Sequence, residues 1–319
     1  MNETSAQLAA LLTETRNPAS ANIDTLSTEE MLRVFNDEDA KIAAAIRAEI
    51  PNIAKAVDAI AERFALGGRL FYTGAGTSGR LGVLDASECP PTYSVPRDLV
   101  VGIIAGGDNA LRLSAEKAED SPDQGVIDLK AAGFGRTIEG PSGEDASAPS
   151  GRRCIDTLVG IAASGRTPYV LGSVAYARSI GALTVGLSCV PGSKLAEGSE
   201  IAITPAVGPE VVTGSTRMKA GTATKLALNM ISTGVMIRGG YVYGNLMVNV
   251  QPTNDKLVDR AVRVIAAATG ADNNTAAKLL HEGGDVKTAI VMQRLTLSKI
   301  EAAATLTKHK GNLRRTLGE

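Results

Sequence analysis

The sequence predicts an α/β fold in which a parallel sheet is covered by helices on both faces. Five short apolar runs have the length and residue types of buried β-strands, and segments with helical periodicity lie between them. Strands that alternate with helices in this way pair in parallel, and such sheets are buried on both faces. The five runs are Arg69–Tyr72, Leu99–Ile104, Thr157–Ile161, Leu183–Leu187 and Ile201–Thr204.

Two helices are predicted before the first strand. Ser27 and Glu30 form a capping-box pattern that begins the first of them. Pro51 is expected to end that helix and to begin the second, because proline fits the first helical position. Residues 1–50 are therefore expected to be a helical lead-in, and residues 51–250 to be the main domain.

The remaining segments follow from composition and spacing. Phe134–Arg153 is rich in Gly, Ser, Pro and Ala and holds few aliphatic residues, so we expect a flexible insertion there. A long, mostly apolar helix is predicted over residues 216–237. Short helices separated by glycines over residues 254–319 predict a small helical C-terminal region.

Composition excludes several classes of partner. The net charge of −1 gives no basic footprint for nucleic acid or for an anionic membrane. No apolar run approaches the roughly 20 residues that span a bilayer. Met1–Arg16 carries acidic residues and has no apolar core, so we do not expect a signal peptide.

Cysteine and histidine are scarce. An odd number of widely spaced cysteines argues against a disulfide framework or a zinc cluster and favours the cytoplasm. They are Cys89, Cys154 and Cys189. The two histidines are His281 and His309, both late in the chain. Proton transfers in an enzyme of this composition would therefore fall to Glu, Asp, Lys or Tyr, and no metal or cofactor is expected.

Two loops of one design follow predicted strands and precede helices. The first loop, residues 73–80, contains Gly76, Thr77, Ser78 and Arg80, and the second loop, residues 163–167, contains Ser164, Gly165, Arg166 and Thr167. Glycine lets the backbone approach an anion, and the hydroxyls and the helix N-terminus supply donors. One such loop could be merely a tight turn, but two favour a phosphate site.

Two other interpretations of these segments stay open. Gly74, Gly76 and Gly79 have the spacing of a dinucleotide-binding loop, but the nearest acidic candidate, Asp108, lies farther along than usual. A third hydroxyl-rich segment, Val211–Thr222, contains Ser215 and precedes the long helix. By composition alone it is slightly more typical of helix capping than of a binding loop.

Two glutamates follow the loops and could overhang the strand ends. Glu88 lies after the first loop's helix, and Glu119 lies beyond the second strand. A glutamate on a helix is more often a solvated surface charge, so position alone does not assign either one a function.

Five long stretches of the chain share the pattern of one family, and they are residues 73–82, 85–92, 160–169, 208–217 and 243–248. In order from about residue 20 to the C-terminus, the chain resembles the N-acetylmuramic acid 6-phosphate etherase family. The resemblance implies a flavodoxin-like sugar isomerase (SIS) domain followed by a small three-helix region. It implies a homodimer and places the family's catalytic glutamates at Glu88 and Glu119.

The implied reaction is hydrolysis of the D-lactyl ether of N-acetylmuramic acid 6-phosphate to N-acetylglucosamine 6-phosphate and D-lactate, in cell-wall sugar recycling. In the open-chain sugar a base removes the C2 proton, an acid protonates the leaving lactate, and water then adds to the double bond. We expect Glu119 to be the base and Glu88 the acid. Two carboxylates in different environments can hold opposite protonation states, so the chemistry needs neither histidine nor metal.

The chain departs from the family pattern at two places. Phe134–Arg153 is longer than expected, and Asn249 stands where the pattern has Asp. Two alternative functions share the fold: an aldose–ketose isomerase, which would release no lactate, and a non-catalytic sugar-phosphate sensor similar to glucokinase regulatory protein.

Overall fold

The predicted parallel sheet is present and has the expected five strands. The computed structural model describes residues 13–113, 116–139 and 152–319. The strands pair in parallel in the order β2-β1-β5-β6-β7. Their bounds are Leu70–Gly74 for β1, Val100–Ile104 for β2, Thr157–Ile161 for β5, Leu183–Leu187 for β6 and Ile201–Ile203 for β7. This order is the flavodoxin-like one, with a topological switch between β1 and β5.

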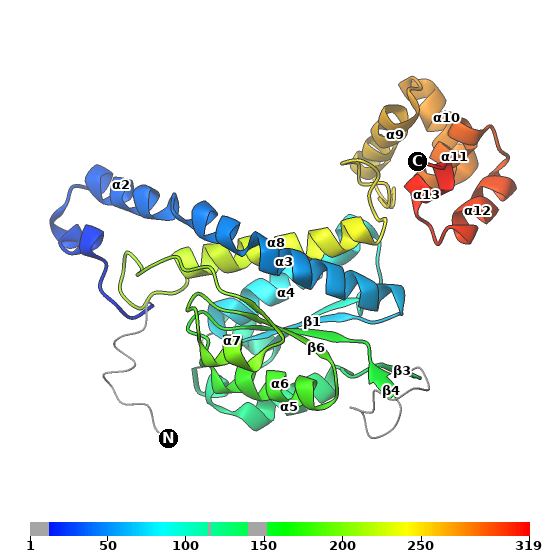
Figure 1. The fold of residues 1–319 in the computed structure, drawn as a ribbon. Coiled ribbons are helices and arrows are strands. Elements are labelled where there is room, and N and C mark those ends of the chain that lie inside the picture. The colour runs from blue at the N-terminus through cyan, green and yellow to red at the C-terminus, as the bar shows by residue number, and fades with distance from the viewer. Residues whose placement is uncertain (1–12, 114–115, 140–151) are drawn as a thin grey trace. The chain divides into compact units, whose positions relative to one another are not determined.

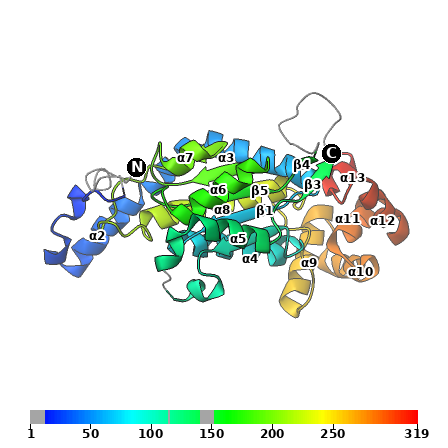
Figure 2. The same ribbon diagram turned by 90° about the horizontal axis from the view of Figure 1, so that it is seen from below.

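Helices cover both faces of the sheet (Figures 1 and 2). On one face lie α3 (Ile42–Ala65), α4 (Gly76–Tyr93) and α8 (Lys219–Arg238), and on the other lie α5 (Pro122–Ala131), α6 (Pro168–Ser179) and α7 (Lys194–Gly198). Because the central strands β1, β5 and β6 are covered on both sides, every residue in them is buried. Because both faces of these strands are buried, their sequences are continuous apolar runs.

The N-terminal helices differ from the prediction at one boundary. Helix α2 (Thr28–Asp39) begins with the predicted capping box, in which Ser27 and Glu30 bond reciprocally. Pro51, however, lies inside α3, and the break between the helices falls at Ala40. Buried Ile46 and Ile53 continue one apolar face across the proline, so packing outweighs the backbone hydrogen bond that Pro51 removes.

The prediction of a flexible insertion over Phe134–Arg153 is wrong at the two ends of that segment. Phe134 is buried and meets Phe71 edge to face, with ring centroids 5.0 Å apart. Strands β3 (Thr137–Glu139) and β4 (Arg152–Cys154) pair in an antiparallel hairpin. The rest of the segment, residues 140–151, lies outside the described residues.

The helical C-terminal region contains five helices where the resemblance implies three. They are α9 (Asp255–Thr269), α10 (Asn273–Gly283), α11 (Val286–Leu295), α12 (Lys299–Lys308) and α13 (Leu313–Leu317). Their apolar faces form one core that includes Ile265 and Ile290. The chain divides into two compact units, residues 1–87 with 98–232 and residues 88–97 with 233–319. Part of α4 and part of α8 therefore belong to the second unit.

Candidate functional site

The first loop joins β1 to α4 through a very close backbone approach. A Cβ atom on Gly74 would lie 2.7 Å from the Gly79 nitrogen, and one on Gly79 would lie 2.6 Å from the Gly74 oxygen. Gly76 begins α4 with a positive φ of 52°. These glycines let the strand run directly into the helix, which leaves Thr77 and Ser78 half-buried in the first turn of α4.

The second loop follows β5 and packs on the connection between β6 and α7. The Cys189 N–H donates to the Ala163 carbonyl at 2.8 Å, and the Leu195 N–H donates to the Gly165 carbonyl at 2.9 Å. Gly165 has a positive φ of 68°, and a Cβ there would lie 2.2 Å from the Ser193 hydroxyl oxygen. The loop is therefore held tightly; the side chains of Ser164, Arg166 and Thr167, also in it, are half-buried.

The two loops flank the topological switch of the sheet. Gly74, the last residue of β1, is opposite Ile161, the last residue of β5. Ligands of open α/β sheets bind at this place, outside the carboxyl ends of the strands. The residues at this edge, where the sequence predicts a phosphate site, are Gly76, Thr77 and Ser78 in the first turn of α4 and Ser164, Gly165, Arg166 and Thr167 after β5.

The first turn of α8 lies beside both loops. A Cβ on Gly221 would lie 3.5 Å from the Thr77 methyl group and 3.5 Å from the Thr216 oxygen. The Cys189 thiol, next to the second loop, lies 3.8 Å from the Ala220 carbonyl oxygen. The third hydroxyl-rich segment, which carries half-buried Ser215, thus leads into a helix that contacts the candidate phosphate site.

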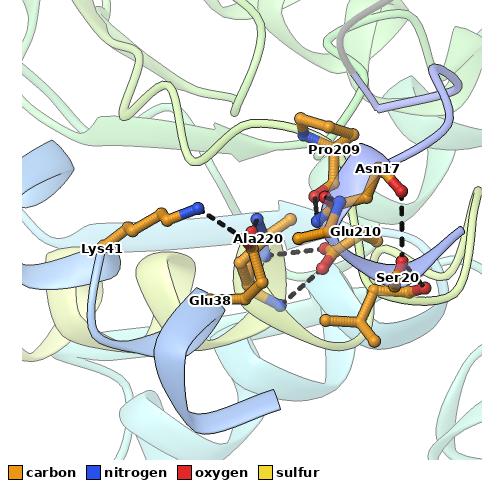
Figure 3. Close-up of polar contacts among 10 residues, drawn as sticks. Asn17, Ser20, Glu38, Lys41, Pro209, Glu210 and Ala220 are labelled. Atoms are coloured by element: carbon orange, nitrogen blue, oxygen red, sulfur yellow. Dashed lines mark hydrogen bonds and ion pairs between the residues drawn. The ribbon is translucent and has the colours of Figure 1, made fainter. Parts of the chain in front are cut away.

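A buried carboxylate already occupies the N-terminus of α8. Glu210 is 1% exposed and accepts hydrogen bonds from the backbone N–H groups of Lys219 and Ala220, both at 2.9 Å (Figure 3). A negative charge at this position also complements the helix dipole. The cap of α8 is therefore Glu210, which lies just before the third segment, and not one of that segment's hydroxyls as the sequence interpretation implied.

Lys219 itself forms a buried ion pair with the N-terminal helix α2. Its ammonium lies 2.6 Å from a carboxylate oxygen of Glu38, and both side chains are almost fully buried. Burial alone would raise the pKa of Glu38, but hydrogen bonds from Lys219, Lys41 and Asn17 outweigh it and lower that pKa to about 2. Sequence reasoning missed Glu38 and Lys219, because nothing local distinguishes them from surface charges.

Arg80 has partners within the protein. Its guanidinium donates to the carbonyl oxygens of Leu111 at 3.1 Å and of Leu113 at 3.2 Å. It thereby holds the segment that contains the 3₁₀ turn η3 (Asp108–Leu111). Its assignment as a substrate ligand stays a prediction.

The two predicted catalytic glutamates are both exposed. Glu88 lies inside α4, two residues before Pro90, and not beyond the end of that helix as the sequence predicted. Pro90 and Pro91 have no N–H groups to donate to carbonyls one turn earlier. The series of backbone hydrogen bonds in α4 is therefore interrupted next to Glu88. Glu119 lies on the 3₁₀ turn η4 (Glu116–Asp120). Glu88 and Glu119 belong to different compact units.

The cysteines and potential metal ligands add no second site. All three cysteines are buried and none forms a disulfide, and burial raises the pKa of Cys189 to about 12, which disfavours the reactive thiolate. Within the described ranges, no group of three or more His, Cys, Asp or Glu residues could hold a metal ion. In the same part of the chain, none of the helices combines the length and apolar character needed to cross a bilayer.

Comparison with known proteins confirms the resemblance. Residues 52–140 match the glucokinase regulatory protein N-terminal SIS domain family. The chain is 51% identical over 317 residues to an N-acetylmuramic acid 6-phosphate etherase of Clostridium botulinum (strain Okra / Type B1), covering 99% of each chain. It is 53% identical over 308 residues to the enzyme of that name from Photorhabdus laumondii, covering 96% of each.

Among solved structures, the chain is similar to the C-terminal domain of glucosamine-fructose-6-phosphate aminotransferase from Francisella tularensis. The TM-score is 0.44 at 16% identity, and the match covers 87% of this chain and 70% of that one. Near-complete coverage at about half identity decides the family. The chain belongs to the N-acetylmuramic acid 6-phosphate etherase family.

Proposed function

We propose that this protein hydrolyses the D-lactyl ether of N-acetylmuramic acid 6-phosphate, giving N-acetylglucosamine 6-phosphate and D-lactate. The observation that carries the proposal is the full-length identity of 51% to a relative that bears the etherase name. The two loops at the topological switch of the sheet are the place where a sugar phosphate would bind in such a fold.

The reaction proceeds by elimination and then hydration. Glu119 as a carboxylate removes the C2 proton of the open-chain aldehyde, and the C3–O bond breaks as Glu88 as an acid protonates the departing lactate oxygen. Water then adds across the C2–C3 double bond, its oxygen to C3 and a proton to C2. Both side chains are exposed and so can reach a substrate, and their assignment follows the family's glutamates.

The phosphate binds at the first and second loops. Thr77 and Ser78 offer hydroxyls in the first turn of α4, and Ser164 and Thr167 offer hydroxyls beyond β5. The corresponding backbone donors of α8 are already used by Glu210, so the first turn of α8 is not the phosphate site. Arg166 and Ser215 are further substrate-binding candidates.

A second candidate function follows from the family match at residues 52–140. That match is to a domain of glucokinase regulatory protein, which favours a non-catalytic sugar-phosphate sensor. A sensor would bind N-acetylmuramic acid 6-phosphate without releasing lactate, and an aldose–ketose isomerase would give a ketose phosphate. A coupled D-lactate assay with N-acetylmuramic acid 6-phosphate separates all three, and absence of lactate would contradict the etherase proposal.

The phosphate assignment has its own test. Ser78→Ala and Ser164→Ala should each raise the KM for N-acetylmuramic acid 6-phosphate, because each removes a donor to the phosphate dianion. Ser87→Ala is the matched control, since the Ser87 hydroxyl donates to the Leu84 carbonyl at 2.8 Å within α4. Equal turnover of unphosphorylated N-acetylmuramic acid would refute a phosphate site at these loops.

The protein is further proposed to act as a cytoplasmic homodimer. Three buried cysteines that form no disulfide fit a reducing compartment. Leu32 on α2 is 56% exposed, and Met31, Val34 and Phe35 on the same helix are only half-buried. A second copy of the chain would cover this apolar face. Light scattering that shows an active monomer at the assay concentration would refute the dimer.

A further inference from the structure

The third hydroxyl-rich segment is closed into a loop by one carboxylate. Glu210 lies just before it and accepts hydrogen bonds from the N–H groups of Lys219 and Ala220 near its end, nine and ten residues later. The conformation of the intervening residues 211–218 therefore depends on where the carboxylate of Glu210 and the first turn of α8 are held.

Segments far away in sequence hold both of these points. The Asn17 amide donates to the Pro209 carbonyl at 3.1 Å, and the Ser20 hydroxyl donates to the Val211 carbonyl at 2.7 Å, so the residues on both sides of Glu210 are fixed (Figure 3). The Lys219 ammonium donates to Glu38 at 2.6 Å. The N-terminal residues 17–41 thus bind both ends of the loop.

The charges in this cluster are buried to an unusual degree. Glu38 is 3% exposed, and Lys219 and Glu210 are each 1% exposed. Glu38 is also the residue of α2 that is buried, although α2 is amphipathic and carries four apolar residues. A buried ion pair is weak as a source of stability, since a packed apolar pair of similar volume often stabilises as much. What the ion pair supplies instead is a defined geometry.

That geometry is transmitted to the candidate phosphate site. The first turn of α8 lies against Thr77 of the first loop and against Cys189, whose N–H holds the second loop. A shift of Lys219 would therefore displace the first turn of α8, which contacts both loops. Displaced loops would no longer be preorganised for the phosphate, and a loss of preorganisation lowers binding affinity.

We propose that Glu38, Lys219 and Glu210 are positioning residues for the sugar-phosphate site, and that the contacts of Asn17 and Ser20 on both sides of Glu210 support them. The cluster touches no substrate; it fixes the first turn of α8 and, through it, the first and second loops. The inference rests on the sugar-phosphate site of the proposed function, but its test does not require ether cleavage.

The experiment measures the Kd for N-acetylglucosamine 6-phosphate by calorimetry, the KM and kcat for lactate release, and amide hydrogen exchange of residues 205–222. Glu38→Gln should weaken binding of N-acetylglucosamine 6-phosphate and raise the KM by about tenfold, with kcat within about threefold. Exchange in residues 205–222 should accelerate. Glu29→Gln is the matched control, because Glu29 pairs with Arg33 on the same helix but is 77% exposed.

A double variant separates positioning from stability. Glu38→Leu combined with Lys219→Met removes both charges, so the melting temperature should stay near that of the wild type. Because the directional hydrogen bond is lost, the Kd should still rise about tenfold. This variant also decides the question if Glu38→Gln does not fold. A Kd within twofold of wild type in the double variant would overturn the proposal, whereas a wild type that binds the sugar phosphate but releases no lactate would count only against the etherase reaction.

Discussion

The buried carboxylate of Asp156 allows a sharp stability prediction at the edge of the sheet opposite the loops. Asp156 is 0% exposed and immediately precedes β5. One oxygen accepts from the backbone N–H and Nε of Arg69, and the other accepts from Nη2 of Arg69 and from the N–H groups of Gly135 and Arg136, at 2.8–3.3 Å. The carboxylate therefore joins the starts of β1 and β5 to the segment after α5.

The substitution Asp156→Asn replaces one of these acceptor oxygens with an NH₂ group. The new NH₂ group then faces the two or three N–H donors that the lost oxygen had accepted from. The guanidinium of Arg69 also loses its counter-charge, and Arg69 is only 8% exposed. Breaking a buried ion pair on one side costs about 3–5 kcal/mol. For a unit of this size each kcal/mol lowers the melting temperature by about 2–4 °C, so the expected fall is roughly 6–20 °C.

Thermal unfolding followed by circular dichroism measures this fall. Asp98→Asn is the matched control, because Asp98 pairs with the neighbouring Arg136 at 3.8 Å but is 66% exposed, and its loss should cost less than about 1 kcal/mol. The Kd for N-acetylglucosamine 6-phosphate should not change in Asp156→Asn, since the pair lies away from the loops. A melting temperature equal to that of the control would refute the reasoning about buried charge.

Two further predictions concern a glycine and a lysine. Gly165→Ala should destabilise the protein more than Gly192→Ala in thermal melts, because both positions have positive φ but only at Gly165 would a Cβ collide, 2.2 Å from the Ser193 hydroxyl oxygen; equal losses would contradict the packing of the second loop. Burial lowers the pKa of Lys287 from 10.5 to about 8. Between pH 8 and pH 10.5 the unfolded chain holds a proton on Lys287 that the folded chain has lost, so the free energy of unfolding should rise with pH in this range. Urea melts at several pH values should show this rise, and Lys287→Met should remove it. An identical pH dependence in the variant would contradict it.

Local sequence patterns predicted the sheet well. Continuous apolar runs mark β1, β5 and β6 because both faces of these strands are covered, and the glycine spacing of the first loop reflects the contact of Gly74 with Gly79. The capping box at Ser27 was also predicted correctly, since its two hydrogen bonds join residues only three apart. In each case the physical cause lies within a few residues of the signal.

Features that depend on distant contacts were not predicted. Pro51 continues a helix because Ile46 and Ile53 have the same tertiary packing surface. Phe134 is ordered because it meets Phe71, from a strand more than sixty residues earlier in the chain. The pairing of Glu38 with Lys219 spans 181 residues, so no local pattern could indicate that either charge is buried.

The central claim is that two glutamates divide one elimination, with Glu119 as base and Glu88 as acid. Proton NMR of N-acetylmuramic acid 6-phosphate in heavy water, with wild type and the two Glu→Gln variants, reads lactate release and C2 exchange in one time course. We predict that Glu119→Gln loses both signals by about 10²–10⁴-fold, while Glu88→Gln loses lactate release but still exchanges the C2 proton. Lactate release near the wild-type rate in both variants would contradict the account.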